Sequence, residues 1–439
     1  MTDQTMPGSS GGVLRCGAAS ALLCGLLGAA GPGTQASAQS YDYYLTGSAS
    51  NVTPDTLGGV LLAGGGSDSN SAMARFNQWA NGGDVVVIRA SGSDGYNDYL
   101  FSDVGGTQPN SVETIVFNRS SASSNAFVLN VLANADAIFI AGGDQDDYYD
   151  LWQGTAVETT LNAHIAAGKP IGGTSAGLAI LGSSGFSAAN GTVFSDEMLD
   201  DPFNQFATLD HDFLETPFLD GVITDSHFVE RNREGRLAGF LARSMFDQGL
   251  DTFRGVGVEE ASAIAIEPTG LGRVYGPSNA EAWFLQATEP ASQIVPGQPL
   301  VIDNIQAVQV TRGGFFDFNT WTGLTNTSEE GWSTANGNLI VGPPVVLPPD
   351  LPGDANGDGL VDLLDFDVLA QHFGSNTGAG PAEGDFNADG VVDLLDFDVL
   401  AQHFGSSAPG AVPEPASLAV LGLGGAASMA RRRERVTAG

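Results

Sequence analysis

The chain has 439 residues, with 16 Lys and Arg against 51 Asp and Glu, and a formal net charge of −35. This length exceeds that of a usual single domain, so we expect more than one folding unit and at least one large core. Such a charge repels nucleic-acid phosphates and anionic membrane surfaces, which excludes nucleic acid as an expected partner. Part of the acidity is expected to bind cations.

Residues 1–38 predict a signal peptide, with Arg15 ahead of an apolar run and a small-x-small cleavage site at the end. Cys16 and Cys24 are the two cysteines of the chain, and both lie in this segment. The mature protein is therefore expected to have no disulfide and no catalytic thiol. A lipoprotein cysteine at Cys24 is the alternative, disfavoured by the leucine before it. No other stretch is apolar enough to span a membrane.

Short β-rich runs alternate with helical stretches over residues 56–283, which is α/β order. The clearest expected strands are residues 59–63, 84–89, 114–117 and 137–141. Their near-continuous apolar character predicts a mostly parallel sheet with helices on both faces. Ligands bind at the carboxyl ends of such strands, so the glycine-rich loops at 64–66, 142–143 and 172–173 predict where a site lies.

Residues 173–177 read Gly-Thr-Ser-Ala-Gly, a G-x-S-x-G turn between a short apolar strand and a helical run. A serine on this turn projects its hydroxyl from the strand end, and the backbone N–H of Ala176 points to where an oxyanion would form. Ser175 is therefore the candidate nucleophile. An inert serine on a turn of small residues is the alternative.

A serine nucleophile needs a base, and His227 is the best placed histidine because it follows an apolar strand. The others lie mid-helix, on an acidic loop or in a repeat: His164, His211, His372 and His403. Another apolar strand leads to Glu259 and Glu260. Strand alternation puts these two on opposite faces, so one of them is expected to orient His227, and Glu260 is favoured. The order Ser, His, acid differs from that of α/β-hydrolases.

Three arginines follow His227 at positions 231, 233 and 236. In so acidic a chain they predict a clamp for anionic or carboxylate groups of a substrate. A salt-bridged helix face is the alternative.

Together these segments resemble cyanophycinases and the dipeptidase E family of serine peptidases, which have a class I glutamine amidotransferase-like fold. The matching segments, spread over roughly residues 56–318, are G-G-D-Q at 142–145, G-G-T-S-A-G at 172–177, D-x-H-F at 225–228 with the arginines behind it, and G-x-G-x-E-E at 255–260. The resemblance implies Ser175 as nucleophile, His227 as base and Glu260 as its partner, with no cofactor for catalysis. It also implies an oxyanion hole at Gly143 and Ala176, and substrate binding by Gln145, Asp225, Arg231, Arg233 and Arg236.

Cyanophycinases hydrolyse the poly-aspartate backbone of cyanophycin to β-Asp-Arg dipeptides, so the resemblance implies a peptide substrate rich in acidic residues, with cyanophycin the first candidate. Ser226 stands where that branch typically has glutamine. An aspartyl or isoaspartyl dipeptidase of the same fold is one alternative. A non-catalytic surface binding protein is the other.

Residues 287–342 are β-rich and complete an expected peptidase domain over 39–342, and the Pro-rich residues 343–352 predict an extended linker. Residues 353–405 hold a repeat with a period of about thirty residues. Each copy matches an EF-hand-like loop with oxygen ligands at positions 1, 3, 5, 7, 9 and 12. The expected calcium ligands are Asp354, Asn356, Asp358, the Leu360 carbonyl, Asp362 and Asp365, then Asp385, Asn387, Asp389, the Val391 carbonyl, Asp393 and Asp396.

The paired loop and helix units resemble a type I dockerin, which implies structural Ca²⁺ and a cohesin module bound through residues 363–364 and 394–395 with their helices. Some of these leucines are alternatively core residues between the two helices. Residues 412–435 place Val-Pro-Glu-Pro before an apolar stretch and an Arg-rich end, which resembles a PEP-CTERM sorting signal. It implies a sorting protease of the exosortase type and a secreted or envelope-attached bacterial protein.

Overall fold

The structure is a computed structural model that describes residues 39–345, 353–355, 360–375, 380, 383–387 and 390–406. The expected signal peptide, the sorting tail and residues 346–352 of the expected linker lie outside these residues. In the part that is described, no helix has the length and apolar character needed to cross a membrane.

The first half of the described chain alternates strands and helices. Its strands are β1 (Tyr41–Gly47), β2 (Val60–Ala63), β3 (Asp84–Arg89), β4 (Ser111–Phe117), β5 (Ala137–Ile140) and β6 (Ile171–Thr174). Its helices are α1 (Asn70–Ala80), α2 (Ala126–Asn134), α3 (Gln145–Trp152), α4 (Ala156–Ala166) and α5 (Ala176–Ala179), with a π-helical turn at Tyr99–Asp103 and a 3₁₀ turn at Ser120–Ser124.

The second half is richer in strands. They are β7 (Ser184–Phe186), β8 (Leu209–His211), β9 (Val222–Ser226), β10 (Phe253–Val258), β11 (Ala263–Ile266), β12 (Leu271–Tyr275), β13 (Glu281–Ala287), β14 (Ile305–Asp317), β15 (Thr322–Ala335) and β16 (Asn338–Gly342). The helices are α6 (Ser195–Asp200), α7 (Glu234–Gln248), α8 (Leu363–His372) and α9 (Leu394–His403).

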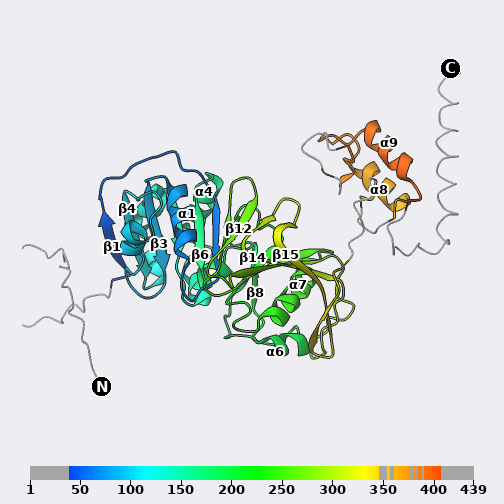
Figure 1. The fold of residues 1–439 in the computed structure, drawn as a ribbon, viewed down its shortest axis with the longest axis horizontal. Coiled ribbons are helices and arrows are strands. Elements are labelled where there is room, and N and C mark those ends of the chain that lie inside the picture. Colours follow the sequence, from blue (N-terminus) through cyan, green and yellow to red (C-terminus); the bar gives the residue numbers. More distant parts are fainter. Residues whose placement is uncertain are drawn as a thin grey trace, which may run out of the picture.

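Five neighbouring strands, in the order β4-β3-β5-β6-β2, run parallel and are flanked by helices on both faces (Figure 1). Strand β3 shows why its sequence is apolar throughout. Val86 and Ile88 pack with α2 to α4, whereas Val85 and Val87 pack with α1, so all four are fully buried. The bounds of β3 are those expected, and β4 begins at Ser111 rather than at 114. The predicted α/β class is confirmed.

Over the described residues, the sheet has 16 strands and is mixed. Strand β9 runs parallel to β10 and β7, while β10 to β16 pair with their other neighbours in antiparallel fashion. The long strands β14 and β15 curve beside α7, and a second core lies between this part of the sheet and that helix (Figure 1). The β-rich C-terminal part expected from the sequence therefore continues the same sheet.

The loop after β2 joins three segments that are distant in the chain. Backbone carbonyls of residues 63–65 accept hydrogen bonds from the N–H groups of Ser175, His227 and Ala261, at 3.0, 2.8 and 2.9 Å. These residues follow β6, β9 and β10. The carboxyl ends of four strands therefore meet at one loop, as expected for the site of an α/β sheet.

Helices α8 and α9 have the same sequence and pack on a small core of Val361, Leu369, Val392 and Leu400. Asp362 and Asp393 cap them by accepting from the N–H groups two residues on, at 2.8 and 2.7 Å. The exposed leucines expected to bind a partner are 46 to 69% exposed, and they lie outside this core. The alternative that they form the core is therefore wrong.

Candidate active site

Ser175 lies on a sharp turn between β6 and α5. Its φ of 55° and ψ of −117° are a backbone conformation that residues other than glycine rarely adopt. The glycines around it are needed for close packing. A Cβ at Gly173 would lie 2.3 Å from the Gly177 carbonyl oxygen, and one at Gly177 would lie 2.2 Å from the Ile140 carbonyl oxygen. The G-x-S-x-G spacing therefore holds the serine hydroxyl at the strand end.

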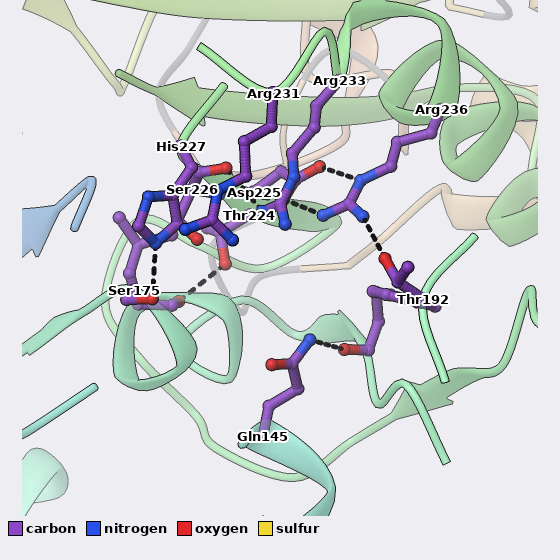
Figure 2. A network of polar contacts seen from close by, with 12 residues as sticks. Gln145, Ser175, Thr192, Thr224, Asp225, Ser226, His227, Arg231, Arg233 and Arg236 are labelled. Carbon is purple, nitrogen blue, oxygen red and sulfur yellow. Dashed lines mark hydrogen bonds and ion pairs between the residues drawn. The ribbon is translucent and has the colours of Figure 1, made fainter. Parts of the chain in front are cut away.

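His227 follows β9 and lies directly against this serine (Figure 2). The Ser175 Oγ and His227 Nε2 atoms are 2.7 Å apart, and His227 Nδ1 contacts Glu260 Oε1. A carboxylate only accepts hydrogen bonds, so the proton on Nδ1 is donated to Glu260 and Nε2 is left to accept from the Ser175 hydroxyl. His227 has a φ of 48°, a second strained conformation at this site.

Of the two adjacent glutamates, Glu260 is the one that meets the histidine. Glu259 faces another way and accepts hydrogen bonds from the N–H groups of Val229 and, at 2.9 Å, Glu230. It is 8% exposed and fixes the turn that follows His227. The two carboxylates thus have separate partners, although both lie beyond the end of β10, where the alternation of a strand no longer applies.

The expected oxyanion-hole residues lie beside the nucleophile. A Cβ at Gly142 would lie 3.3 Å from Ser175 Cβ, so the turn at residues 142–143 passes next to the serine. Gly143 and Ala176 line a chamber of about 70 Å³ together with Ser175 and His227. This chamber adjoins a larger cavity of about 460 Å³, and Gln145, Arg231 and Arg233 are common to both.

Asp225 and Arg236, which were expected to bind substrate, pair with each other, and each lines one of the two cavities. Arg236 Nη2 and Nε donate to Asp225 at 2.6 and 2.7 Å, and both side chains are 3 to 4% exposed. Burial by itself would raise the pKa of Asp225, but Arg236 and Arg233 outweigh burial and hold that pKa below its usual range. These two charges neutralise each other beneath the site and support it.

Arg231 and Arg233 line both cavities, and Arg233 Nη1 also donates to Asp225 Oδ1 at 3.2 Å. The Arg231 side chain is 51% exposed, and its Nη2 lies 3.5 Å from Glu260 Oε1. Arg233 is more enclosed and donates to the Ser226 carbonyl at 2.7 Å, and burial lowers its pKa to about 10, so it is still charged at neutral pH. Figure 2 shows both guanidinium groups on the side of the cavity that faces Ser175. The clamp for substrate carboxylates stays a prediction, and all three arginines line the larger cavity.

Gln145 is the first residue of α3 and lines both cavities across from the arginines (Figure 2). Its Nε2 donates to the Phe186 carbonyl at 3.3 Å, a long hydrogen bond. The amide is therefore held near Ser175 without being tightly fixed.

A second serine and histidine pair lies outside this site. Ser184 Oγ and His211 Nδ1 are also 2.7 Å apart, but their further partner is the amide of Gln248 instead of a carboxylate. Ser184 is 1% exposed and lies within β7, so no substrate can reach it. The remaining histidine of the peptidase part is His164. It is 6% exposed and forms a hydrogen bond with the Pro170 carbonyl oxygen, as expected for a packing residue.

Residues 76–272 match peptidase family S51, a segment that contains Ser175, His227 and Glu260. The chain carries a family S51 peptidase domain. Residues 352–405 match the dockerin type I domain, and residues 411–433 match the PEP-CTERM protein-sorting motif. The S51 domain is a serine-type peptidase, and the two further segments make the chain a secreted, envelope-associated bacterial protein.

Solved structures give weaker similarities. A peptidase from an acI-B1 Actinobacterium is 15% identical, with a TM-score of 0.40, over 60% of this chain and 97% of its own. A putative peptidase E from Listeria monocytogenes EGD-e is 15% identical, with a TM-score of 0.33, over 50% and 99%. A type II cohesin–dockerin structure from Bacteroides cellolosolvens is 41% identical, with a TM-score of 0.12, over 13% and 92%. No curated protein matches the chain.

The loop at residues 64–66 has a larger role than sequence reasoning gave it. A Cβ at Gly64 would lie 2.0 Å from the Glu259 carbonyl oxygen, and one at Gly65 would lie 2.5 Å from the His227 ring. Asp68 follows this loop and accepts from Tyr96 Oη at 2.6 Å, which ties the loop to the chain after β3. In the sequence, the signal for this role of the loop is three consecutive glycines directly after an apolar strand.

Asp225→Ala is expected to destabilise the S51 domain by about 3–5 kcal/mol, because it leaves the buried Arg236 charge without its partner. Chemical denaturation followed by circular dichroism measures this. The matched control is Asp247→Ala, which breaks the Arg243–Asp247 pair on α7. An i,i+4 pair of this kind contributes about 0.3–0.5 kcal/mol. Equal losses in the two variants would contradict the structural role of Asp225.

The pH dependence of kcat/KM tests His227. Burial lowers the pKa of His227, and the charges of Arg231 and Arg233 lower it further. Only the neutral imidazole can accept a proton, so activity is retained down to pH values below 6.5 and lost as the pH falls through the lowered pKa. Arg231→Gln removes one of these charges and is expected to move the acid limb to higher pH.

Arg243→Gln is the control for charge removal, since Arg243 pairs with Asp247 away from His227. Its acid limb should coincide with that of the unaltered chain. An Arg231→Gln profile that does not move, or that moves to lower pH, would contradict the electrostatic assignment.

Proposed function

We propose that this peptidase hydrolyses aspartate-rich, cyanophycin-like peptides through Ser175, His227 and Glu260. The observation that carries the proposal is the continuous chain of contacts from Ser175 Oγ to His227 Nε2 and from His227 Nδ1 to Glu260, at the carboxyl ends of the strands. This chain of contacts contains the nucleophile, base and orienting acid of serine hydrolases, and each of the three residues follows a separate strand.

The reaction follows from these positions. Ser175 Oγ attacks the scissile carbonyl carbon while His227 Nε2 accepts the hydroxyl proton. The N–H groups of Gly143 and Ala176 would donate to the oxyanion that forms. His227 then returns the proton to the leaving amine, and the C–N bond breaks to give an acyl-enzyme. Water, deprotonated by His227, releases the acid product and restores Ser175.

We attribute the choice of substrate to the positive charges in the cavity. Arg231 and Arg233 are cations in a cavity of a chain whose net charge is −35, so a substrate carboxylate beside the scissile bond gains two guanidinium partners there. Gln145 adds an amide on the opposite side. Ser226, 3% exposed, has a shorter side chain than the glutamine typical of cyanophycinases, which leaves more room in the chamber.

The dockerin is proposed to bind two Ca²⁺ ions and a cohesin module, and the tail to be processed by an exosortase-type protease. Asp365 and Asp396 support the calcium sites. They are fully buried at position 12 of each loop, where the N–H groups of Asp362 and Asp393 donate to them at 2.8 and 2.9 Å. The expected ligands Asn356, Asp358 and Asp389 lie outside the described residues. Among the residues that are described, no cluster of three or more His, Cys, Asp or Glu could hold a metal ion.

Ser175→Ala is expected to lower kcat by about 10⁴-fold or more, because the attacking atom is removed. The measurement is release of dipeptides from insoluble cyanophycin, run beside α- and β-aspartyl dipeptides. Ser184→Ala is the matched control, since Ser184 has an equally short contact to a histidine but no carboxylate behind it. Full activity in Ser175→Ala, or its loss in Ser184→Ala, would contradict the proposed triad.

Chelation of calcium is expected to unfold residues 353–405 and to leave the peptidase active. The loops gather several carboxylates that repel one another unless a cation lies between them, and the core of this module is small. Limited proteolysis of the full chain with and without chelator locates the change, and hydrolysis of a soluble aspartyl peptide is followed in parallel. Resistance of this segment in chelator would refute the calcium sites, and loss of activity would refute the independence of the two modules.

A further inference from the structure

The loop at residues 64–66 has few side chains that could hold it in place. Its three glycines have none, and Ser67 is exposed. Gly65 and Gly66 have positive φ angles of 94° and 71°, a region that glycine enters at little cost. A Cβ at Gly66 would lie 3.1 Å from Glu260 Oε2, so the loop passes against the orienting acid as well as the histidine. A loop this pliable needs an anchor from elsewhere in the chain.

Asp68 is the first residue after the glycines with a partly buried side chain. Its carboxylate accepts from Tyr96 Oη at 2.6 Å, and the side chain of Thr174 also contacts it. Thr174 is the last residue of β6 and directly precedes Ser175. One carboxylate therefore connects the loop after β2 both to the segment after β3 and to the turn of the nucleophile.

Tyr96 is itself held firmly. Its ring packs against that of Phe139, with centroids 5.2 Å apart. The next residue, Asn97, is 2% exposed, and its amide donates to the Val112 carbonyl at 3.0 Å. Burial raises the pKa of Asp68 and that of Tyr96, so the phenol keeps its proton and donates it. The loop is thus tied to a rigid part of the sheet.

We propose that Asp68 and Tyr96 are positioning residues that hold the loop at 64–66 against Ser175 and His227. The inference rests on the proposed function, since it takes Ser175 as the nucleophile. Backbone carbonyls of this stretch accept from the N–H groups of Ser175 and His227, so a shift of the loop displaces both. Such a displacement lengthens the 2.7 Å contact from Oγ to Nε2, on which proton transfer depends.

The proposal separates catalysis from substrate binding. Residues 64–68 are absent from the described linings of the two cavities that contain Gln145 and Arg231. Loss of the Asp68–Tyr96 bond is therefore expected to lower kcat and to leave KM for a soluble aspartyl peptide unchanged.

The test compares Tyr96→Phe with Tyr43→Phe in the full-length chain. Tyr43 is the matched control, because its Oη donates to Glu113 Oε2, also at 2.6 Å, on the edge strand β1. The probe is a small uncharged alkyl fluorophosphonate, which forms a P–O bond with Ser175 Oγ and releases fluoride while His227 takes the hydroxyl proton. Tyr96→Phe is expected to slow this labelling about 10- to 100-fold, and Tyr43→Phe to leave it unchanged.

Urea denaturation of both variants measures stability separately. Each variant loses one tyrosine–carboxylate hydrogen bond, so comparable shifts of the midpoint are expected. Asp68→Ala should slow labelling as Tyr96→Phe does. Asp68→Asn should stay within about threefold of the unaltered chain, because hydroxyl groups can donate to the amide oxygen or accept from its nitrogen.

Equal labelling rates in Tyr96→Phe and Tyr43→Phe, or a raised KM with an unchanged kcat in Tyr96→Phe, would overturn the inference. So would Asp68→Asn that is as slow as Asp68→Ala. If Tyr96→Phe does not fold, the comparison of Asp68→Ala with Asp68→Asn decides alone. Absence of labelling at Ser175 in the unaltered chain would contradict the proposed function together with this inference, whereas labelling that ignores Asp68 and Tyr96 contradicts this inference only.

Discussion

The site depends on one backbone loop, residues 64–66. This loop accepts hydrogen bonds from the segments after β6, β9 and β10 and packs against them. The carbonyls of residues 63–65 fix Ser175, His227 and Ala261, and all three of these residues have positive φ angles. Each such conformation costs of order 1–3 kcal/mol, so the surrounding hydrogen bonds must hold it. No side chain fits at Gly64 or Gly65 without striking Glu259 backbone or the His227 ring. Close backbone approach is thus what brings nucleophile and base together.

A second constraint is the scarcity of positive charge. The chain has 16 basic residues, yet three arginines follow His227 within one short segment. Arg236 is buried with Asp225, packs over the Phe186 and Phe240 rings at 5.0 and 5.6 Å, and anchors the segment. Arg233 bridges this pair to the cavity, and Arg231 reaches solvent. The exposure of the three guanidinium groups therefore rises from the buried Arg236 through Arg233 to the exposed Arg231.

The two folded modules reach stability by different means. The peptidase part has large cores on both faces of its sheet. The dockerin has a core of four buried apolar residues with Phe386 partly covered, which is too small to order its loops without further support. Its outward leucines remain exposed for a partner.

The sequence by itself determined the features that depend on local pattern. Apolar runs predicted β3 with its observed bounds, and the glycine spacing around Ser175 predicted the turn, because both are set by neighbouring residues. The sequence also predicted different partners for Glu259 and Glu260, and in the structure Glu260 contacts His227 whereas Glu259 accepts from the N–H group of Glu230. The mixed sheet beyond the parallel core could not be predicted, since strand pairing is decided by packing over long sequence separations.

Only the tertiary structure decided how the charges are used. Asp225 and the arginines share one motif, and nothing in their spacing tells a buried ion pair from a ligand clamp. The structure adds their burial: Arg236 of α7 is enclosed with Asp225, whereas Arg231 precedes α7 and is exposed. Residue type and spacing fix local geometry, whereas the burial of a charge depends on which distant segments cover it.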